Sequence, residues 1–284
     1  MLTFEGRQGP EQVDPPDYPE PGVPTWWSEA KLGLFVHWGL YSLPAFACPP
    51  GPRADERDSY ARHTYAEWYA NTARIPSSPS WRRHRERYGD AAYDDLAESW
   101  HPDAFDADAF AADAVRWGAR YLIPTTKHHD GFCLWDSATT DFTSTRKGPG
   151  RDLVAELGAA SRRRGLRFGC YFSGALDWHV SDFGPITSNE ELFAFRRNDR
   201  AFADLAADQL RELIERFRPD VLWNDIDWPD AGKGRGGRDL AALFAHYHAL
   251  VPDGVLNDRW GVPYHGHLTR EYIDVPDIVA EPWE

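Results

Sequence analysis

The sequence predicts an α/β protein with a (β/α)8-type TIM barrel, of which about six of the eight βα units are present. Two observations support this fold class. Short apolar or aromatic runs alternate along the chain with longer segments of helical periodicity, which is the pattern of βαβ units in a parallel sheet. Polar residues also gather at the carboxyl end of nearly every apolar run, and a parallel barrel collects these ends around one pocket.

The expected strands are short runs rich in apolar, β-branched and aromatic residues. They lie at residues 32–39, 120–131, 166–174, 220–227, 254–261 and, with a weaker pattern, 277–284. In the run at 220–227, the apolar Val221-Leu222-Trp223 is followed at once by Asn224 and Asp225. The other polar residues at the carboxyl ends of the runs are His37, His128, His129, Asp130, Tyr171, Asn257, Asp258 and Arg259.

Four segments between the runs have the spacing of amphipathic helices. They lie at residues 106–119, 151–165, 198–217 and 239–251. An open doubly wound sheet also alternates strands with helices, but it has one crevice served by two or three strand ends. The glycine-rich segment GKGRGG at 232–237 matches neither GxGxxG nor a P-loop, and is interpreted as a flexible loop. The barrel is therefore favoured.

The expected domain organisation is simple. Residues 1–24 are rich in proline and predict an extended arm, and residues 25–284 predict a catalytic barrel domain. The sixth run reaches the final residue, Glu284, although a closed barrel has eight strands. We therefore expect a barrel that stops before its last strands.

Composition narrows the class of protein. The formal charge of -14 disfavours nucleic acid and anionic membrane surfaces, and the basic run at 81–90 is interpreted as a solvated helix or loop face. Cys48, Cys133 and Cys170 are widely spaced and predict small buried residues. No apolar segment has the length of a signal sequence or a membrane span, so the expectation is a soluble cytoplasmic protein.

The 13 tryptophans point to a sugar-binding pocket. Aromatic faces beside rigid hydrogen-bonding groups suit a neutral, polyhydroxylated ligand with apolar CH faces. The alternative is that each tryptophan fills the core, but as a group they are expected to border the pocket. Those close to polar strand ends are Trp38, Trp68, Trp135, Trp178, Trp223, Trp228 and Trp260.

Glycoside hydrolysis requires two carboxyl groups that flank the scissile bond. Asp225 is the candidate nucleophile, because it is the first carboxylate after a buried run. Its alternative role is a helix cap or a structural ion pair. The residues alone leave four candidates for the partner acid, which are Glu67, Glu271, Glu281 and Glu284.

A set of motifs in fixed order resembles the α-L-fucosidases of glycoside hydrolase family 29. The motifs are LGLFVHWGLYSLPAF, EWYA, TTKHHDGFCLWDS, TDFTS, GPGRDLV, GCYFSGALDW, DVLWNDIDWP and NDRWG, from about residue 25 to the end of the chain. The combination of KHHDGF, WND and NDRWG is the most specific part. The resemblance implies a retaining exo-glycosidase on a barrel that releases terminal L-fucose from a fucosylated oligosaccharide or glycoconjugate, with no cofactor and no metal.

The resemblance also implies residue roles. Asp225 of the WND motif corresponds to the nucleophile, and Glu271 of the TREY segment to the general acid/base, which has to be protonated at the start of the reaction. The residues that correspond to fucose-binding and pocket-lining positions are His37, Glu67, Trp68, His128, His129, Tyr171, Trp223 and Arg259.

Three features depart from the family pattern. Asp227 stands where the family often has a small residue, and on an extended strand it would share a face with Asp225 and influence its charge or pair with an arginine. The segment at 48–70 carries extra residues before EWYA, near Glu67. Family members also continue past the final Trp-Glu into the remaining strands and usually a β-sandwich.

Two other readings remain open at the level of sequence. A metal-dependent barrel hydrolase could use a site formed from His37, His128, His129, Asp130, His265 and His267. A sugar-binding relative without turnover would keep the pocket and lack the reaction. Barrel fucosidases often associate, so a homo-oligomer is possible.

Overall fold

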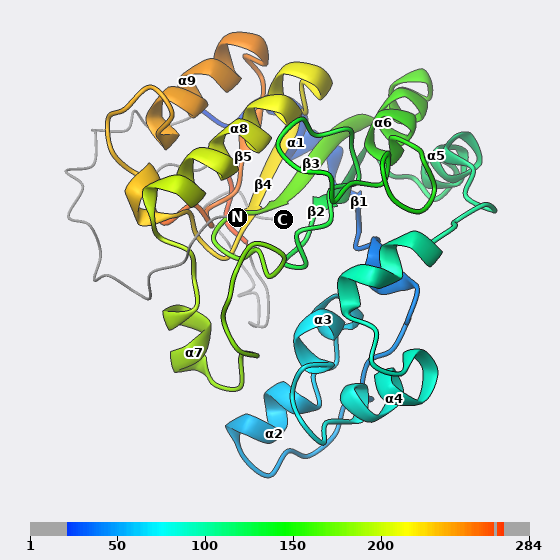
Figure 1. The fold of residues 1–284 in the computed structure, drawn as a ribbon. Coiled ribbons are helices and arrows are strands. Elements are labelled where there is room, and N and C mark those ends of the chain that lie inside the picture. The colour runs from blue at the N-terminus through cyan, green and yellow to red at the C-terminus, as the bar shows by residue number, and fades with distance from the viewer. Residues whose placement is uncertain (1–21, 264–265, 270–284) are drawn as a thin grey trace.

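A single parallel sheet forms the centre of the protein, whose computed structural model describes residues 22–263 and 266–269 (Figure 1). Its order is β1-β2-β3-β4-β5. Every strand pairs with the next strand along the chain, as in a barrel, whereas a doubly wound sheet reverses its order. The strands are β1 Gly33–Val36, β2 Tyr121–Lys127, β3 Arg167–Ser173, β4 Val221–Asp225 and β5 Val255–Leu256.

The predicted α/β barrel class is therefore confirmed, and five of the predicted strands are observed. The fifth is shorter than predicted and has only two residues. The sixth run at 277–284 and most of the predicted arm at 1–24 lie outside the described residues.

The four predicted helices follow the strands and arch over one face of the sheet (Figure 1). Aspartate N-caps begin three of them, because Asp106, Asp152 and Asp199 each accept a hydrogen bond from a backbone N–H of the first turn. The helices are α5 Ala107–Arg116, α6 Leu153–Arg163, α8 Arg200–Phe217 and α9 Leu240–Leu250.

Alternation along the strands divides the core between the two faces of the sheet. Leu122, Phe172 and Leu222 face the helices and join the large core beneath them. The second face carries a smaller cluster that packs around the N-terminal helix α1 (Thr25–Ala30). Its strand residues are Ile123, Tyr171, Val221, Trp223 and Val255. This second face, called the inner face below, leads directly to the candidate site.

A group of short helices lies apart from the main helical layer, on the other side of the molecule (Figure 1). No element was predicted between the first strand and the helix at 106–119, yet most of these short helices belong to that segment. Helix α4 contains most of the basic run at 81–90, whose arginines are largely solvated, as predicted. The elements are η1 Leu40–Ser42, α2 Glu56–Ala61, η2 Ala66–Trp68, α3 Tyr69–Thr72, α4 Pro79–Tyr88 and η3 Tyr93–Ser99, and later α7 Asn189–Ala194. The single turn η4 Asp230–Gly232 lies instead against α8 of the main helical layer.

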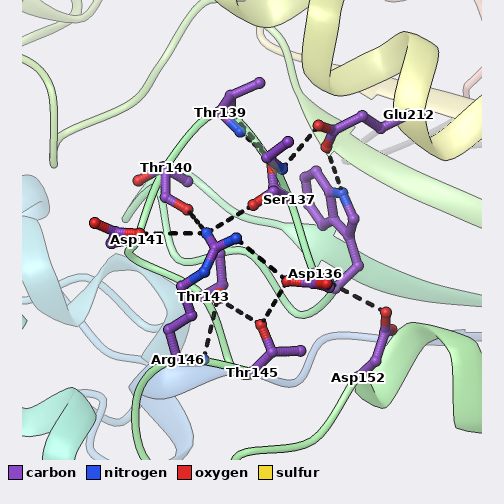
Figure 2. Close-up of polar contacts among 12 residues, drawn as sticks. Asp136, Ser137, Thr139, Thr140, Asp141, Thr143, Thr145, Arg146, Asp152 and Glu212 are labelled. Atoms are coloured by element: carbon purple, nitrogen blue, oxygen red, sulfur yellow. Dashed lines mark hydrogen bonds and ion pairs between the residues drawn. The ribbon is translucent and has the colours of Figure 1, made fainter.

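The long loop between β2 and α6 is held by its own polar side chains (Figure 2). Arg146 donates from Nη1 to the carbonyl oxygens of Ser137, at 2.8 Å, and Thr140. Glu212, which comes from α8, accepts the backbone N–H of Ala138 at 2.9 Å. Asp152 of the GPGRDLV motif accepts the backbone N–H of Asp136 at 3.1 Å. These contacts fix the loop that follows His128 and His129, and they give a structural role to the TDFTS and GPGRDLV motifs.

The structure also tests the predictions for the cysteines, the glycine-rich segment and membrane-spanning helices. The three cysteines are buried and free, as predicted. The GKGRGG segment is a loop with a single turn of η4 at its start. In the part of the chain that is described, no helix combines the length and the apolar character needed to cross a membrane.

A buried ion pair links the KHHDGF motif to the helix layer. Lys127 is completely buried and donates from Nζ to Asp177 Oδ2 at 3.1 Å and to Gln209 Oε1 at 2.9 Å. The pairing of β2 with β3 shifts register between Thr125 and Lys127. The Lys127 side chain lies over Phe172, with Nζ 4.4 Å from the centroid of the ring. A buried charge is tolerated only with such partners.

We predict that Lys127→Met lowers the free energy of unfolding by about 3–5 kcal/mol, because it leaves the Asp177 carboxylate buried without a cation. The double variant Lys127→Met, Asp177→Asn removes both charges and should recover part of that loss. Urea unfolding measures both, with Lys147→Met in an exposed ion pair as the control. Equal destabilisation by the single and double variants would contradict this role.

Candidate functional site

A cavity of about 870 Å³ lies at the carboxyl ends of the strands. Strand ends and the loops that follow them supply one part of its lining, including His37, His128, His129, Trp223 and Asp225. The segment before η2 and helix α7 supply another part, which is called the outer wall and consists of Pro50, Gly51, Arg53, Ser59, Tyr60, Arg62, His63, Thr64, Tyr65, Asn189 and Leu192. This volume is within the range of pockets that hold small-molecule ligands.

Asp225 is the last residue of β4, and its side chain is only 12% exposed. Because side chains alternate along a strand, Asp225 lies on the same inner face as Val221 and Trp223. Three donors satisfy its carboxylate. Tyr171 donates from its hydroxyl to Oδ2 at 2.8 Å, while Arg259 Nη1 and the backbone N–H of Ile226 donate to Oδ1 at 3.0 and 2.9 Å. The site therefore holds a buried, oriented carboxylate.

Two asparagines fix the strand end that carries Asp225. Asn257 accepts the backbone N–H of Asn224 at 2.9 Å and donates to its carbonyl oxygen at 2.8 Å. The Asn257 side chain thus continues the pairing of β4 where the backbone of β5 has ended, which explains why β5 is so short. Asn224 in turn donates from Nδ2 to the carbonyl oxygen of Arg259 at 2.7 Å. Asn224 therefore acts on Asp225 through the position of Arg259.

The expectation that Asp227 shares a face with Asp225 is wrong. The strand ends at Asp225, and Ile226 and Asp227 both have positive φ, 58° and 69°. The chain turns away there, so the period of two no longer applies. Asp227 instead pairs with Arg196, at 3.2 Å, and Lys233, at 2.9 Å. The alternative expectation, that Asp227 pairs with an arginine, is confirmed.

His129 presents a hydrogen-bond acceptor beside Asp225. Ser173 donates its hydroxyl proton to the carbonyl oxygen of Leu176 at 2.7 Å, so its oxygen accepts from His129 Nδ1, also at 2.7 Å. In the neutral ring Nε2 is then unprotonated, and it lies 3.7 Å from Asp225 Oδ2. Burial is the main reason why the pKa of His129 is held well below its usual value, and the neighbouring His37 and Lys127 lower it further. The neutral ring can accept a hydrogen bond from a ligand hydroxyl at Nε2.

His128 completes the floor of the cavity. Its ring stacks on Tyr171 with centroids 5.3 Å apart and an interplanar angle of 4°. Burial is the main reason why the pKa of His128 is held well below its usual value, and His129 and His37 lower it further. Its Nδ1 is buried with no hydrogen-bond partner in residues 22–263 and 266–269. An unpaired buried polar atom at a cavity is a feature that a polar ligand satisfies.

The turn η2 brings Glu67 and Trp68 to the opposite wall. Trp68 packs edge-on against His129, with ring centroids 5.6 Å apart, and it also contacts His63. The His63 ring lies flat on the Trp68 ring, at 4.7 Å and 10°. Sequence reasoning missed His63, and only its place four residues before Glu67 connects it with the motif. Burial, followed by the charge of Arg53, lowers the pKa of His63 to about 4.

The tryptophans divide between the pocket and the core, which corrects the expectation for the group. Trp68 and Trp223 line the cavity. Trp178 packs behind Trp68 at 5.4 Å, and Trp38 packs against the large core. The core explanation is correct for three others, which are fully buried: Trp135, Trp228 and Trp260.

The six-residue metal site is not assembled in the described part of the chain. Asp130 accepts hydrogen bonds from the Tyr93 hydroxyl at 2.7 Å and the Phe132 backbone N–H at 3.2 Å, and His267 packs against Trp27 at 4.4 Å. His265 lies outside the described residues. Two smaller groups have potential ligand atoms within 4.8 Å of one another: His37 with Glu67 and His128, and His128 with His129 and Asp225.

The structure brings most of the candidate site residues together at one cavity. The cavity brings together His37, Glu67, Trp68, His128, His129, Trp223, Asp225 and Arg259, while Tyr171 contacts Asp225 from β3. Glu271, Glu281 and Glu284 lie outside the described residues, although Thr269, two positions before Glu271, lines the cavity.

A buried carboxylate among histidines and tryptophans, at the strand ends of a parallel barrel sheet, is the arrangement typical of barrel glycoside hydrolases. Comparisons with known proteins make the class specific. The sequence profile of the family described as Alpha-L-fucosidase matches residues 12–284. The chain therefore belongs to the α-L-fucosidase family.

Relatives of known name agree with this membership. A Dictyostelium discoideum α-L-fucosidase is 29% identical over 84% of this chain and 49% of its own length, and the Bos taurus tissue α-L-fucosidase is 31% identical over 87% and 49%. A Thermotoga maritima α-fucosidase, whose structure is solved in complex with fucose, is 42% identical with a TM-score of 0.83, over 92% of this chain and 58% of that chain. The chain spans about half the length of the curated relatives that it matches.

Asp130 gives the site a predicted pH dependence. Burial raises the pKa of this carboxyl to about 7, with the Tyr93 and Phe132 hydrogen bonds acting in the opposite direction. Between about pH 4 and pH 7 the folded state therefore binds a proton that the unfolded state releases, so the stability contributed by this group falls as pH rises from about 4 to 7 and changes little above that.

We predict that Asp130→Asn, which mimics the protonated form, gains up to a few kcal/mol of stability relative to wild type between pH 4 and pH 8. Urea unfolding at the two pH values measures the difference. The exposed Asp141→Asn is the control. A constant difference between Asp130→Asn and wild type across this range would contradict the buried proton.

Proposed function

We propose that this chain carries the catalytic site of a retaining α-L-fucosidase, which hydrolyses terminal α-L-fucosyl linkages of an oligosaccharide or glycoconjugate by double displacement. The observation that carries the proposal is the position of Asp225. Its carboxylate stands at the end of β4, held by Tyr171 and Arg259, at a cavity whose other walls supply histidines and tryptophans. Family membership and the fucose complex of the Thermotoga maritima relative support the same substrate.

In the proposed first step, a carboxylate oxygen of Asp225 attacks the anomeric carbon of fucose while the bond to the leaving oxygen breaks. Tyr171 and Arg259 orient the carboxylate by donating hydrogen bonds to its two oxygens. The product is a fucosyl ester of Asp225 and the released aglycone. A water molecule then cleaves the ester, which restores Asp225 and gives L-fucose with net retention.

Histidines and tryptophans around the carboxylate are proposed to bind the sugar. His129 Nε2 accepts from a fucose hydroxyl, because the contact with Ser173 assigns the proton of the ring to Nδ1. His37, Glu67 and His128 supply further polar atoms. The faces of Trp68 and Trp223 suit the apolar side of the sugar ring.

Glu271 is proposed as the general acid/base. It protonates the leaving oxygen in the first step and accepts a proton from water in the second. The support is its match to the family motif and its place two residues after Thr269, which lines the cavity.

We predict that the purified chain releases 4-nitrophenol from 4-nitrophenyl α-L-fucoside and that Asp225→Gly lowers kcat by roughly a thousandfold or more, because no nucleophile remains. Added azide should restore part of the rate, since a small anion can occupy the vacated space. The control is Asp253→Gly, in an exposed turn before β5 at the opposite end of the sheet, and it should keep the wild-type rate.

The same assay tests the acid/base. Glu271→Ala should slow hydrolysis of a fucosyl galactoside far more than that of the aryl fucoside, whose leaving group needs no proton, while Glu281→Ala should affect both equally or not at all. Unchanged turnover in Asp225→Gly would overturn the assignment of the nucleophile. A folded chain that binds fucose without hydrolysing either substrate would favour the sugar-binding alternative.

A further inference from the structure

The outer wall of the cavity extends the site beyond the residues around Asp225. It comes from the segment before η2 and from α7, which lie on the same side of the molecule, away from the main helical layer (Figure 1). The two parts are joined, because Tyr60 donates from its hydroxyl to Asn189 Oδ1 at 2.8 Å and Glu56 accepts the backbone N–H of Asn189 at 3.1 Å. An exo-acting enzyme would bind the remainder of its substrate against such a wall.

Arg62 presents a guanidinium on the outer wall whose only ion pair within the described residues is a loose contact with Asp58, one turn earlier along α2. Its side chain is 43% exposed and donates no hydrogen bond to any residue in 22–263 or 266–269, and Nε is buried. The nearest carboxylate oxygen is Asp58 Oδ1, 4.0 Å from Nε. Arg62 directly follows the last residue of α2, but its side chain does not donate to the carbonyl oxygens at the end of this helix. The planar guanidinium group can therefore bind an oxyanion through two parallel hydrogen bonds.

Arg53 fixes the position of Arg62 and adds a second positive charge. Its Nη2 donates to the carbonyl oxygen of Arg62 at 2.8 Å and to that of Pro49 at 3.2 Å, and its Nη1 to the carbonyl oxygens of Gly51 and Pro52. Neutral carbonyls satisfy these donors but do not cancel the charge. No carboxylate among the described residues forms an ion pair with Arg53.

The acidic residues of the same segment accept backbone hydrogen bonds, and only Asp58 among them also lies near Arg62, with Oδ1 4.0 Å from Nε. Asp55 accepts the backbone N–H of Asp58 at the start of α2, Glu56 accepts that of Asn189, and Asp58 accepts that of Ala54 at 3.1 Å. None of these three lines the cavity. The outer wall therefore presents two arginines in a protein whose formal charge is -14.

We propose that Arg62, held by Arg53, binds an anionic group on the sugar that carries the fucose. The chemical class is an oxyanion, either the carboxylate of a uronic acid or a sulfate ester. This inference rests on the proposed function, because it assigns the acceptor side of the same cavity. It makes the chain selective for acidic fucosylated glycans, although the fucose itself is neutral.

The experiment compares three disaccharides that differ in one group: α-L-fucosyl-galactoside, α-L-fucosyl-galacturonide and α-L-fucosyl-galactoside 6-sulfate. Calorimetric binding to the full chain with Asp225→Asn gives Kd without turnover, and kcat/KM of the wild-type chain gives the catalytic counterpart. A charge-assisted arginine contact predicts roughly tenfold tighter binding of the acidic sugar. The acidic disaccharide that shows the preference identifies the carboxylate or the sulfate.

Arg62→Gln should reduce the ratio between acidic and neutral disaccharides to about one. Arg57→Gln, which changes an exposed arginine of α2 that does not line the cavity, should keep the wild-type ratio. Equal binding of all three disaccharides would overturn the subsite, as would a preference that survives in Arg62→Gln. Binding with the predicted ratio but without hydrolysis would retain the subsite and reject the activity. Absence of binding by any disaccharide would overturn both.

Discussion

The burial of the Asp225 carboxylate is the constraint on which the rest of the site depends. A carboxylate that is 12% exposed needs donors, and each donor here is fixed by another part of the fold. Tyr171 comes from the neighbouring strand and stacks between His128 and Trp223. Arg259 is positioned by Asn224, which is itself clamped by Asn257. The WND and NDRWG motifs are thus two halves of one hydrogen-bonded unit across adjacent strand ends.

The cavity has walls of different origin and different charge. Strand ends supply the neutral histidines and the carboxylate, so this part inherits the rigidity of the parallel sheet. The segment before η2 and α7 supply the arginines of the outer wall. Loops on a rigid scaffold are where specificity commonly varies. The segment at 48–70, in which the sequence predicted extra residues before EWYA, supplies most of this outer wall.

Sequence predicted the sheet and helices well because apolar runs and aspartate N-caps are local signals. It placed Asp225 at the pocket because that residue directly follows an apolar run, and the carboxyl ends of parallel strands meet at one edge of the sheet. The expectation from the period of two along a strand failed for Asp227, because the left-handed backbone at Ile226 leaves no trace in composition. The short helices after β1, the contact of His63 with Trp68 and the position of the Arg62 guanidinium depend on tertiary packing, which no local pattern encodes. The core positions of Trp135, Trp228 and Trp260 could not be separated from pocket positions for the same reason.

The most direct test of the central claim is to trap the covalent intermediate. The chain is incubated with 2-deoxy-2-fluoro-α-L-fucosyl fluoride, whose fluorine slows cleavage of the sugar ester, and the labelled peptide is sequenced by mass spectrometry. We expect one fluorofucosyl group per chain, attached to Asp225. Attachment to Glu67 or another carboxylate, or a folded chain that acquires no label, would contradict this assignment.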